Sequence, residues 1–206
     1  MVPFSFTAET HEYALHDGRT VVPSITQILK MSGWVDDTWF NDEASERGRE
    51  VHRLTAAWDM RALPADWGRE AVSEYRGYLL AHEKATALVR PSWANIELPR
   101  VESRLGFAGT IDRDGAMFGA VSVAEVKTGP ARKAVVNGYA STDHAIQLAL
   151  QAILLSEDVK LPPEAIQRFG WYLKANGKCC VEPHTDPRDF AEARRLIRDY
   201  GLGDLR

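Results

Sequence analysis

Two neighbouring segments with strand character, residues 105–112 and 121–128, carry charged side chains where a sheet normally buries apolar ones. Side chains of a strand point alternately to the two faces of a sheet, so Glu125 and Lys127 share one face. If the two segments pair, Asp112 can lie near Glu125. Buried carboxylates are costly unless they are paired with a cation or bind a metal. The segments therefore predict a sheet with a polar, functional face.

The chemistry of these three charged groups has two interpretations. Carboxylates are hard oxygen ligands of the kind that Mg²⁺ or Mn²⁺ prefers, and the carbonyl oxygen of Val126 could add a third oxygen. A lysine beside such a site can orient or deprotonate a water, or stabilise charge on a phosphate. Alternatively, the acidic residue and the Glu-x-Lys tripeptide lie on a solvated face, since this tripeptide is common by chance. Motifs elsewhere in the sequence are needed to choose between the metal-site and the solvated-face interpretation.

Composition limits the classes of protein that fit. With 206 residues, 45% hydrophobic and 26% charged, the chain suits one globular domain spanning residues 1–206. It has no run of about 18 apolar residues and no secretory signal, so we expect no membrane span and a cytoplasmic location. The adjacent Cys179 and Cys180 are too few for an iron–sulfur cluster. The net charge of −4 neither favours nucleic acid nor excludes a local basic cleft.

The order of the expected elements predicts the fold class. Helices come first (a helical portion at about 23–90), then a sheet core at about 94–182 that contains one helix, and then a last helix. This order is typical of an α/β (α+β) domain with a mixed central β-sheet and helices on both faces. Expected elements are a hairpin at 12–22 with Asp17-Gly18 in its turn, helices at 23–33, 41–60, 68–88, 142–156 and 187–200, strands at 95–103, 104–112, 120–128, 168–175 and 178–184, and a loop at 130–140.

Five short motifs occur in an order that resembles a known family. G-T-I-D at 109–112, followed by E-V-K-T at 125–128, resembles the PD-(D/E)XK nuclease superfamily. The closest resemblance is to its RecB-type and phage exonuclease branch, which includes the mitochondrial genome-maintenance exonuclease. R-G-R-E-V-H at 47–52, H-A-I-Q-L-A-L-Q-A at 144–152 and P-S-I-T-Q-I-L at 23–29 are similar to further motifs of that branch. The resemblance implies a restriction-endonuclease-like core.

The resemblance also implies a catalytic centre that holds one or two Mg²⁺ or Mn²⁺ ions. The implied side-chain metal ligands are His52, Asp112 and Glu125. The carbonyl of Val126 would be a further ligand, Lys127 the catalytic lysine, and Gln147 a residue that positions lysine, water or phosphate. The chain departs from the branch at Gln151, where a tyrosine is common. Some members have an acidic residue at the position of Glu97, as a ligand of a second metal or as a buried partner.

Contacts to a DNA backbone are expected from hydroxyl, guanidinium, ammonium and imidazole groups around this centre. The candidates are Ser24, Thr26, Arg47, Thr128, Arg132, Lys133 and His144. Several of the candidate site residues have a plainer interpretation as well. Arg132 and Lys133 can be solvated loop charges, His52 can be a structural histidine, and Gln147 can lie at a solvent-exposed helix edge.

Together these features predict a metal-dependent DNA exonuclease that hydrolyses phosphodiester bonds in phage or bacterial DNA recombination, repair or processing. Its partners would be single- or double-stranded DNA and a recombination or replication protein, with no membrane and no iron–sulfur cluster. The resemblance implies a 3′-oxygen leaving group and a new 5′-phosphate. Two alternatives stay open, a catalytically inactive nucleic-acid-binding module on the same fold and an endonuclease of restriction or repair type.

Overall fold

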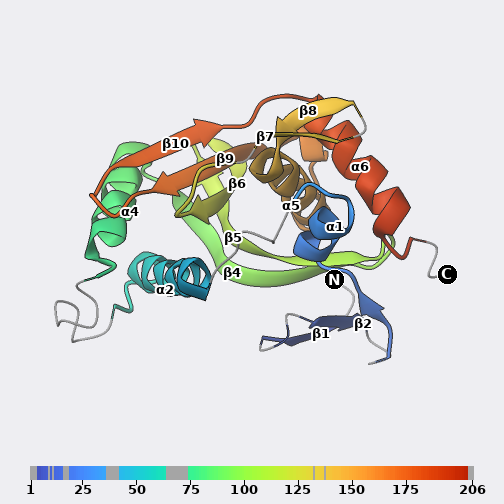
Figure 1. Ribbon diagram of the computed structural model, residues 1–206, viewed down its shortest axis with the longest axis horizontal. Helices are drawn as coiled ribbons and strands as arrows, with labels where there is room; N and C mark the ends of the chain where they lie inside the picture. Colours follow the sequence, from blue (N-terminus) through green and yellow to red (C-terminus); the bar gives the residue numbers. More distant parts are fainter. Residues whose placement is uncertain are drawn as a thin grey trace.

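The centre of the computed structural model is one five-stranded sheet with the strand order β10-β9-β6-β5-β4 (Figure 1). The structure describes residues 4–8, 10, 12–15, 19–35, 42–63, 74–131, 133–136 and 138–203. The strands of the sheet are β4 (Ser92–Glu102), β5 (Phe107–Met117), β6 (Ala120–Lys127), β9 (Gln167–Leu173) and β10 (Cys179–Pro183). Strands β6 and β9 are parallel and the other neighbours antiparallel, which confirms the predicted mixed sheet.

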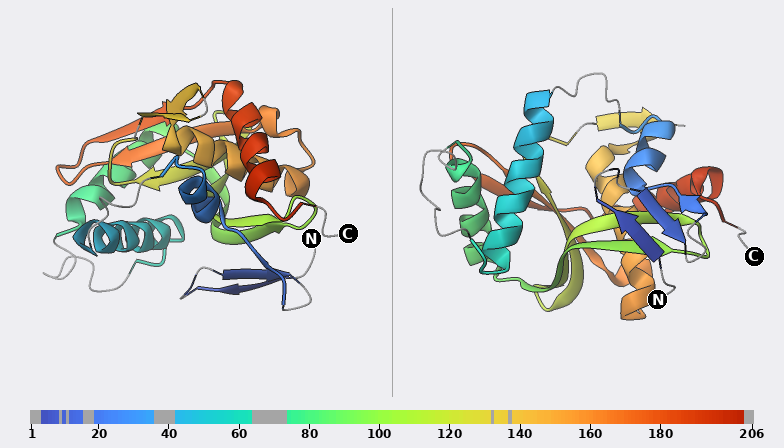
Figure 2. Two further views of the ribbon diagram at one scale, coloured as in Figure 1. Left: turned by 45° about the vertical axis from the view of Figure 1, so that its right-hand side comes forward. Right: turned by 90° about the horizontal axis from the view of Figure 1, so that it is seen from below.

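Helices cover both faces of this sheet (Figures 1 and 2). On one face lie α2 (Asp42–Asp59) and α4 (Arg76–Val89), and on the other lie α1 (Ile25–Met31), α5 (Asp143–Val159) and α6 (Arg188–Tyr200). Each face has its own apolar core, one joining α1, α5 and α6 to β5 and β6, the other joining α2 and α4 to β6 and β9. A short 3-10 helix, η1 (Pro163–Ala165), precedes β9. The predicted flanking helices are thus confirmed, although α4 begins at Arg76, and residues 68–73 of the helix expected at 68–88 lie outside the described residues. No helix among the described residues is long and apolar enough to cross a membrane.

The β5–β6 hairpin differs from the expected pairing. Residues 113–117 pair with 120–124, instead of 105–112 with 121–128. The turn consists of Phe118 and Gly119, both with positive φ, and such a two-residue turn sets the register of a hairpin. The sequence between Asp112 and this turn contains Gly115 and predicts a loop. Instead, residues 113–117 continue strand β5 and pair with residues 120–124 of β6. The register brings Asp112 level with Glu125, one step beyond the last backbone pair.

The segment 130–140, expected to be a loop, contains a second hairpin. Strands β7 (Lys133–Val136) and β8 (Tyr139–Thr142) pair with each other, and Gly138 lies in their turn with φ of +79°. The side chain of Val136 packs against the apolar core of α1, α5 and α6. The segment itself has no strong local sequence pattern. Its structure therefore depends on packing against a core formed by residues that are distant in the sequence.

The N-terminal part of the chain adds smaller elements. Strands β1 (Phe4–Thr7), β2 (Glu12–Leu15) and β3 (Val21–Val22) form a separate three-stranded sheet. The expected Asp17-Gly18 turn lies outside the described residues. Ser24 caps α1 as predicted, in a reciprocal pair of hydrogen bonds with Gln27.

Candidate active site

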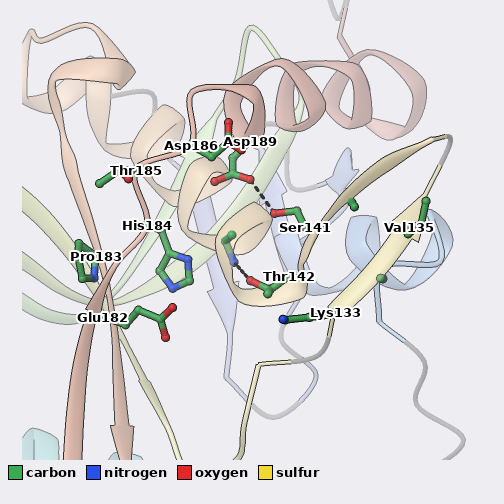
Figure 3. A pocket seen from close by; sticks show the side chains of 13 residues that line it. Lys133, Val135, Ser141, Thr142, Glu182, Pro183, His184, Thr185, Asp186 and Asp189 are labelled. Atoms are coloured by element: carbon green, nitrogen blue, oxygen red, sulfur yellow. Dashed lines mark hydrogen bonds between the residues drawn. The ribbon is translucent and has the colours of Figure 1, made fainter.

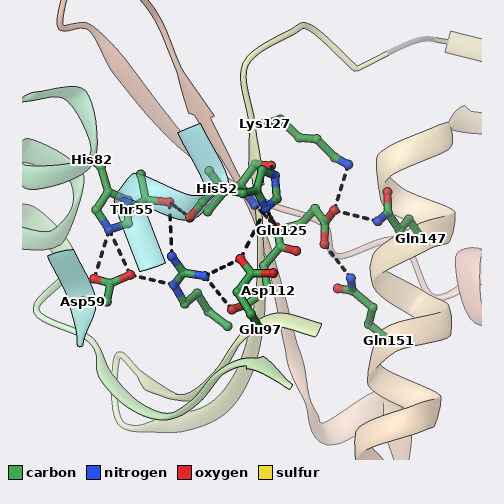
Figure 4. Close-up of polar contacts among 12 residues, drawn as sticks. His52, Thr55, Asp59, His82, Glu97, Asp112, Glu125, Lys127, Gln147 and Gln151 are labelled. Carbon is green, nitrogen blue, oxygen red and sulfur yellow. Dashed lines mark hydrogen bonds and ion pairs between the residues drawn. The ribbon is translucent and has the colours of Figure 1, made fainter. Parts of the chain in front are cut away.

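Glu125 of β6 is the most densely hydrogen-bonded carboxylate of the sheet face that lies under α5 (Figure 4). Its Oε1 accepts from Nζ of Lys127 at 2.8 Å and from Nε2 of Gln147 at 2.6 Å. Its Oε2 accepts from Nε2 of Gln151 at 2.5 Å. A carboxylate offers about four lone-pair positions, so these three donors leave room for one more ligand.

His52 approaches the same strands from α2. Its Nε2 donates to the carbonyl oxygen of Val126 at 2.9 Å. Its Nδ1 lies 3.3 Å from Oε1 of Glu97 and 3.5 Å from Oδ2 of Asp112. That Oδ2 also accepts the backbone N–H of Val126 at 2.8 Å. The structure therefore brings His52 together with Asp112 and the Val126 carbonyl, and Glu125 lines the same cavity, although the metal-binding role of these four predicted groups remains a prediction.

The electrostatics of this cluster are strongly perturbed. Burial, together with the charge of Glu125, raises the pKa of Asp112 to about 8. Burial opposes the charged form of His52, but Asp112 and Glu97 outweigh it and raise the pKa of His52 to about 9. Burial likewise opposes the ionised form of Glu125, yet Lys127 and His52 lower its pKa. In the protein alone, the closely spaced acidic groups therefore favour protonation. A bound cation would stabilise their ionised forms and release protons.

The donor atoms fit a divalent ion. One ligand atom each from His52, Glu97 and Asp112 lies within 4.8 Å of the other two. Carboxylate and carbonyl oxygens suit Mg²⁺ and Mn²⁺, and the imidazole adds a nitrogen donor of the kind that transition-metal ions accept. Figure 4 shows His52, Glu97 and Asp112 pointing toward one another from α2, β4 and β5.

Glu97 reaches the cluster through an unusual backbone conformation. Its φ is +50° within strand β4, a region that non-glycine residues rarely adopt. The neighbouring pairs Ile96↔Arg113 and Leu98↔Ile111 place it opposite Asp112. From the sequence, Glu97 was predicted only as an acidic residue on the preceding strand. No local sequence pattern indicates its positive φ.

Three further polar residues behind the cluster were not predicted. Arg113, Asp59 and His82 have almost no exposed side-chain surface and are linked by hydrogen bonds. Asp59 and His82 lie on helices whose partners cannot be read from the sequence. Arg113 directly follows Asp112, and its charge inside an apolar strand was the available signal.

Two adjacent cavities meet at this cluster. One, of about 650 Å³, is lined by Ser24, Thr26, Gly48, His52, Glu97, Asp112, Glu125, Lys127, Gln147 and Gln151, among others. Its neighbour, of about 500 Å³, shares His52, Lys127 and Gln147 and is also lined by Arg47, Thr128 and His144. The site thus lies in a cleft between α2 on one side and α1 with α5 on the other, and five candidate DNA contacts line that cleft.

His144 is 8% exposed, and its Nδ1 lies 3.2 Å from the hydroxyl of Tyr172. Burial and the charge of Lys127 lower the pKa of His144 to about 4, so its ring is neutral at pH 7. Any contact of this ring with a phosphate would therefore be a hydrogen bond without charge.

Lys133 is not part of this cleft. It is exposed on β7 and lines another cavity of about 650 Å³, formed with the ends of β8 and β10 (Figure 3). The carboxylate of Asp189 in that cavity accepts from Ser141, Tyr139 and Arg168. Arg132 lies outside the described residues.

The mixed sheet carries an aspartate and a Glu-x-Lys on adjacent strands, beside a histidine and a glutamine from the flanking helices. The chain belongs to the PD-(D/E)XK nuclease superfamily, which it matches over residues 26–204. The predicted membership and the restriction-endonuclease-like core are thereby confirmed. A sequence search of curated proteins found no match.

Two solved structures that match this chain differ in how similar they are to it. One is described as a suspected exonuclease from Eubacterium rectale, with 10% identity and a TM-score of 0.50, covering 96% of this chain and 84% of that one. Another, of SSO0001, has 14% identity and a TM-score of 0.37, and the match covers 85% of this chain and 82% of that one. The first similarity supports the fold, and the second is too weak to carry an argument.

Proposed function

We propose that the protein is a metal-dependent DNA exonuclease that hydrolyses phosphodiester bonds. The observation that carries the proposal is the convergence of His52, Asp112 and Glu125 on one cleft, with Lys127 bonded to Glu125. Membership of a nuclease superfamily supports hydrolysis of nucleic acid. The fold neighbour described as a suspected exonuclease favours action at DNA ends over internal cleavage.

One or two Mg²⁺ or Mn²⁺ ions would be held by His52, Asp112, Glu125 and the carbonyl of Val126. Such an ion supplies Lewis acidity and makes a bound water more acidic. Gln147 and Gln151 orient Glu125 by donating to its two oxygens. The buried Asp112, whose pKa is raised in the protein alone, would lose its proton when a cation is present.

Lys127 acts in this proposal as a fixed positive charge. Burial opposes its charge, but Glu125 and Asp112 raise the pKa of its ammonium group above the ordinary value. The side chain is 24% exposed, so it can reach a substrate in the cleft. A permanently protonated lysine stabilises negative charge on the phosphate that is attacked, and it is a poor base for water.

Phosphate contacts along the DNA strand would come from residues that line the two cavities. The proposed contacts are Ser24, Thr26, Arg47, Thr128 and His144. We expect a role in DNA recombination, repair or processing in the cytoplasm, together with a recombination or replication protein. The free thiols of Cys179 and Cys180 are compatible with that reducing compartment.

The decisive test is degradation of end-labelled linear DNA, compared with closed circular DNA, in Mn²⁺, in Mg²⁺ and in a chelator. The proposal expects metal-dependent loss of linear DNA only, and loss of activity in Asp112→Ala and Lys127→Ala. Cutting of circular DNA would indicate an endonuclease. Full activity of both variants, or wild-type protein that binds neither ion by calorimetry, would refute the proposed mechanism.

A further inference from the structure

Arg113 is a fully buried arginine that contacts two residues of the candidate metal site, Glu97 and Asp112. Its Nε donates to Asp59 at 2.6 Å, and its Nη1 donates to Glu97 at 3.0 Å and to the carbonyl oxygen of Asp112 at 2.7 Å. Its Nη2 donates to the hydroxyl of Thr55 at 3.2 Å. One guanidinium group therefore connects helix α2 with strands β4 and β5.

This guanidinium reaches His52 by two routes. The first runs through Glu97, whose Oε1 lies between Nη1 of Arg113 and Nδ1 of the His52 ring. The second runs through Thr55, whose hydroxyl donates to the backbone carbonyl of His52 at 3.1 Å. Ring and backbone of His52 are thus both tied to the same buried group.

A second helix fixes the far end of this network. Both carboxylate oxygens of Asp59 lie 3.0 Å from Nε2 of His82 on α4, and the His82 side chain is fully buried. Asp59 lies two turns after His52 on α2. The network therefore sets both the distance and the rotation of α2 relative to the sheet.

We propose that Arg113 is a positioning residue, which holds His52 and Asp112 in the geometry that the metal requires. This inference rests on the proposed function. A buried ion pair adds little net stability compared with apolar side chains of similar size, so core stability alone does not account for the network. The planar guanidinium can donate to four groups at fixed angles, which an ammonium group cannot do. Partners of metal ligands commonly control metal affinity in this way.

Arg100 provides a matched control within the same strand pair. It is a 4% exposed arginine on β4, and it donates to Asp114 of β5 at 2.7 Å and to Asp158 of α5. Like Arg113 it links buried strands to a helix through carboxylates, but none of these partners is a candidate metal ligand. Arg100→Lys should therefore destabilise the fold without changing the metal site.

The experiment compares Arg113→Lys, Thr55→Val and Arg100→Lys in the full chain. Thermal unfolding measures stability, and calorimetry measures Mn²⁺ affinity. We expect Mn²⁺ to bind about 10- to 100-fold more weakly to Arg113→Lys and Thr55→Val. Arg100→Lys should keep the wild-type Mn²⁺ affinity even if its unfolding temperature falls equally. Thr55→Val removes only one hydroxyl, so it reports on positioning if Arg113→Lys does not fold.

A second readout needs no metal. NMR signals of the His52 imidazole in metal-free protein should shift in Arg113→Lys and Thr55→Val, and stay at wild-type positions in Arg100→Lys. Wild-type Mn²⁺ affinity and unshifted His52 signals in Thr55→Val and any folded Arg113→Lys would overturn the inference. If the wild type itself binds no Mn²⁺, the proposed function fails, while the His52 signals still decide whether Arg113 positions the ring.

Discussion

Nε2 of Gln151 donates to Oε2 of Glu125 at 2.5 Å, at the position where the resemblance to the exonuclease branch implied a tyrosine. The Gln151 side chain is fully buried, and its Oε1 has no hydrogen-bond partner among the residues that the structure describes. Its amide is therefore directed at the carboxylate rather than satisfied within the helix. Gln151 thus supplies a buried donor to Glu125.

Gln151→Leu should weaken metal-dependent DNA degradation by about 10- to 100-fold, because a hydrogen bond to a charged group is lost in a buried site. Degradation rates at saturating Mn²⁺ measure the effect. Gln167→Leu, at an exposed position of β9, is the control and should keep the wild-type rate. An unchanged rate in Gln151→Leu would show that Gln147 and Lys127 suffice to hold Glu125.

Mn²⁺ should stabilise the folded protein. At an ion concentration 100 times the dissociation constant, binding contributes about 2.7 kcal/mol, or roughly 5–10 °C in unfolding temperature for a chain of this size. Differential scanning fluorimetry with and without a chelator measures the shift. Glu125→Ala should show no shift, and a shift equal to that of the wild type would place the ion elsewhere.

Lys127→Ala should lower the rate of DNA hydrolysis by about 10²- to 10³-fold while Mn²⁺ affinity changes little, since Lys127 is expected to stabilise charge on the phosphate. Single-turnover kinetics and calorimetry separate the two effects. Lys178→Ala, at an exposed position after the β9 strand, is the control. Loss of Mn²⁺ binding in Lys127→Ala would instead assign this lysine to the integrity of the metal site.

Gly48 lies on α2 one turn before His52, and a Cβ atom added there would meet no heavy atom within 4 Å. Gly48→Ala should therefore raise the free energy of unfolding by about 0.5–1 kcal/mol, through lower backbone entropy in the unfolded chain. Gly48→Leu should fold but slow DNA degradation, because its side chain enters the cleft. Urea unfolding and degradation assays test both, and a wild-type rate in Gly48→Leu would exclude DNA from this side of the cleft.

Asp59 should make stability depend on pH. Burial opposes its ionised form, but the hydrogen bond from His82 and the charge of Arg113 outweigh burial and lower the pKa of the carboxyl. The stabilisation from Asp59 is thus complete above its unfolded pKa of about 3.9, and it is lost as pH falls through the lower folded value. Asp59→Asn should cost about 3–5 kcal/mol at pH 7 and less below pH 4.

Urea unfolding at pH 7 and pH 3.5 measures this cost. Glu83→Gln, at an exposed position of α4, is the control and should change stability little at either pH. A cost of Asp59→Asn that is equal at the two pH values would mean that the ionised carboxylate contributes nothing beyond its shape.

Local rules determined much of the site. Alternation along a strand places Glu125 and Lys127 on one face of the sheet. Helical spacing places Gln147 and Gln151 one turn apart on the same side of their helix. The sequence alone therefore predicted which side chains share a face within each element. The capping pair of Ser24 and Gln27 is likewise a rule of adjacent residues. Such features depend on backbone geometry within a few residues, which the order of amino acids specifies directly.

Tertiary structure decided what these groups meet. The turn at Phe118 and Gly119 set the β5–β6 register, and the left-handed backbone of Glu97 turned an acidic side chain toward His52. The network of Arg113 joins helices and strands that are far apart in the chain. These relations depend on how elements pack, since the cost of burying each charge is offset only by partners that folding brings together.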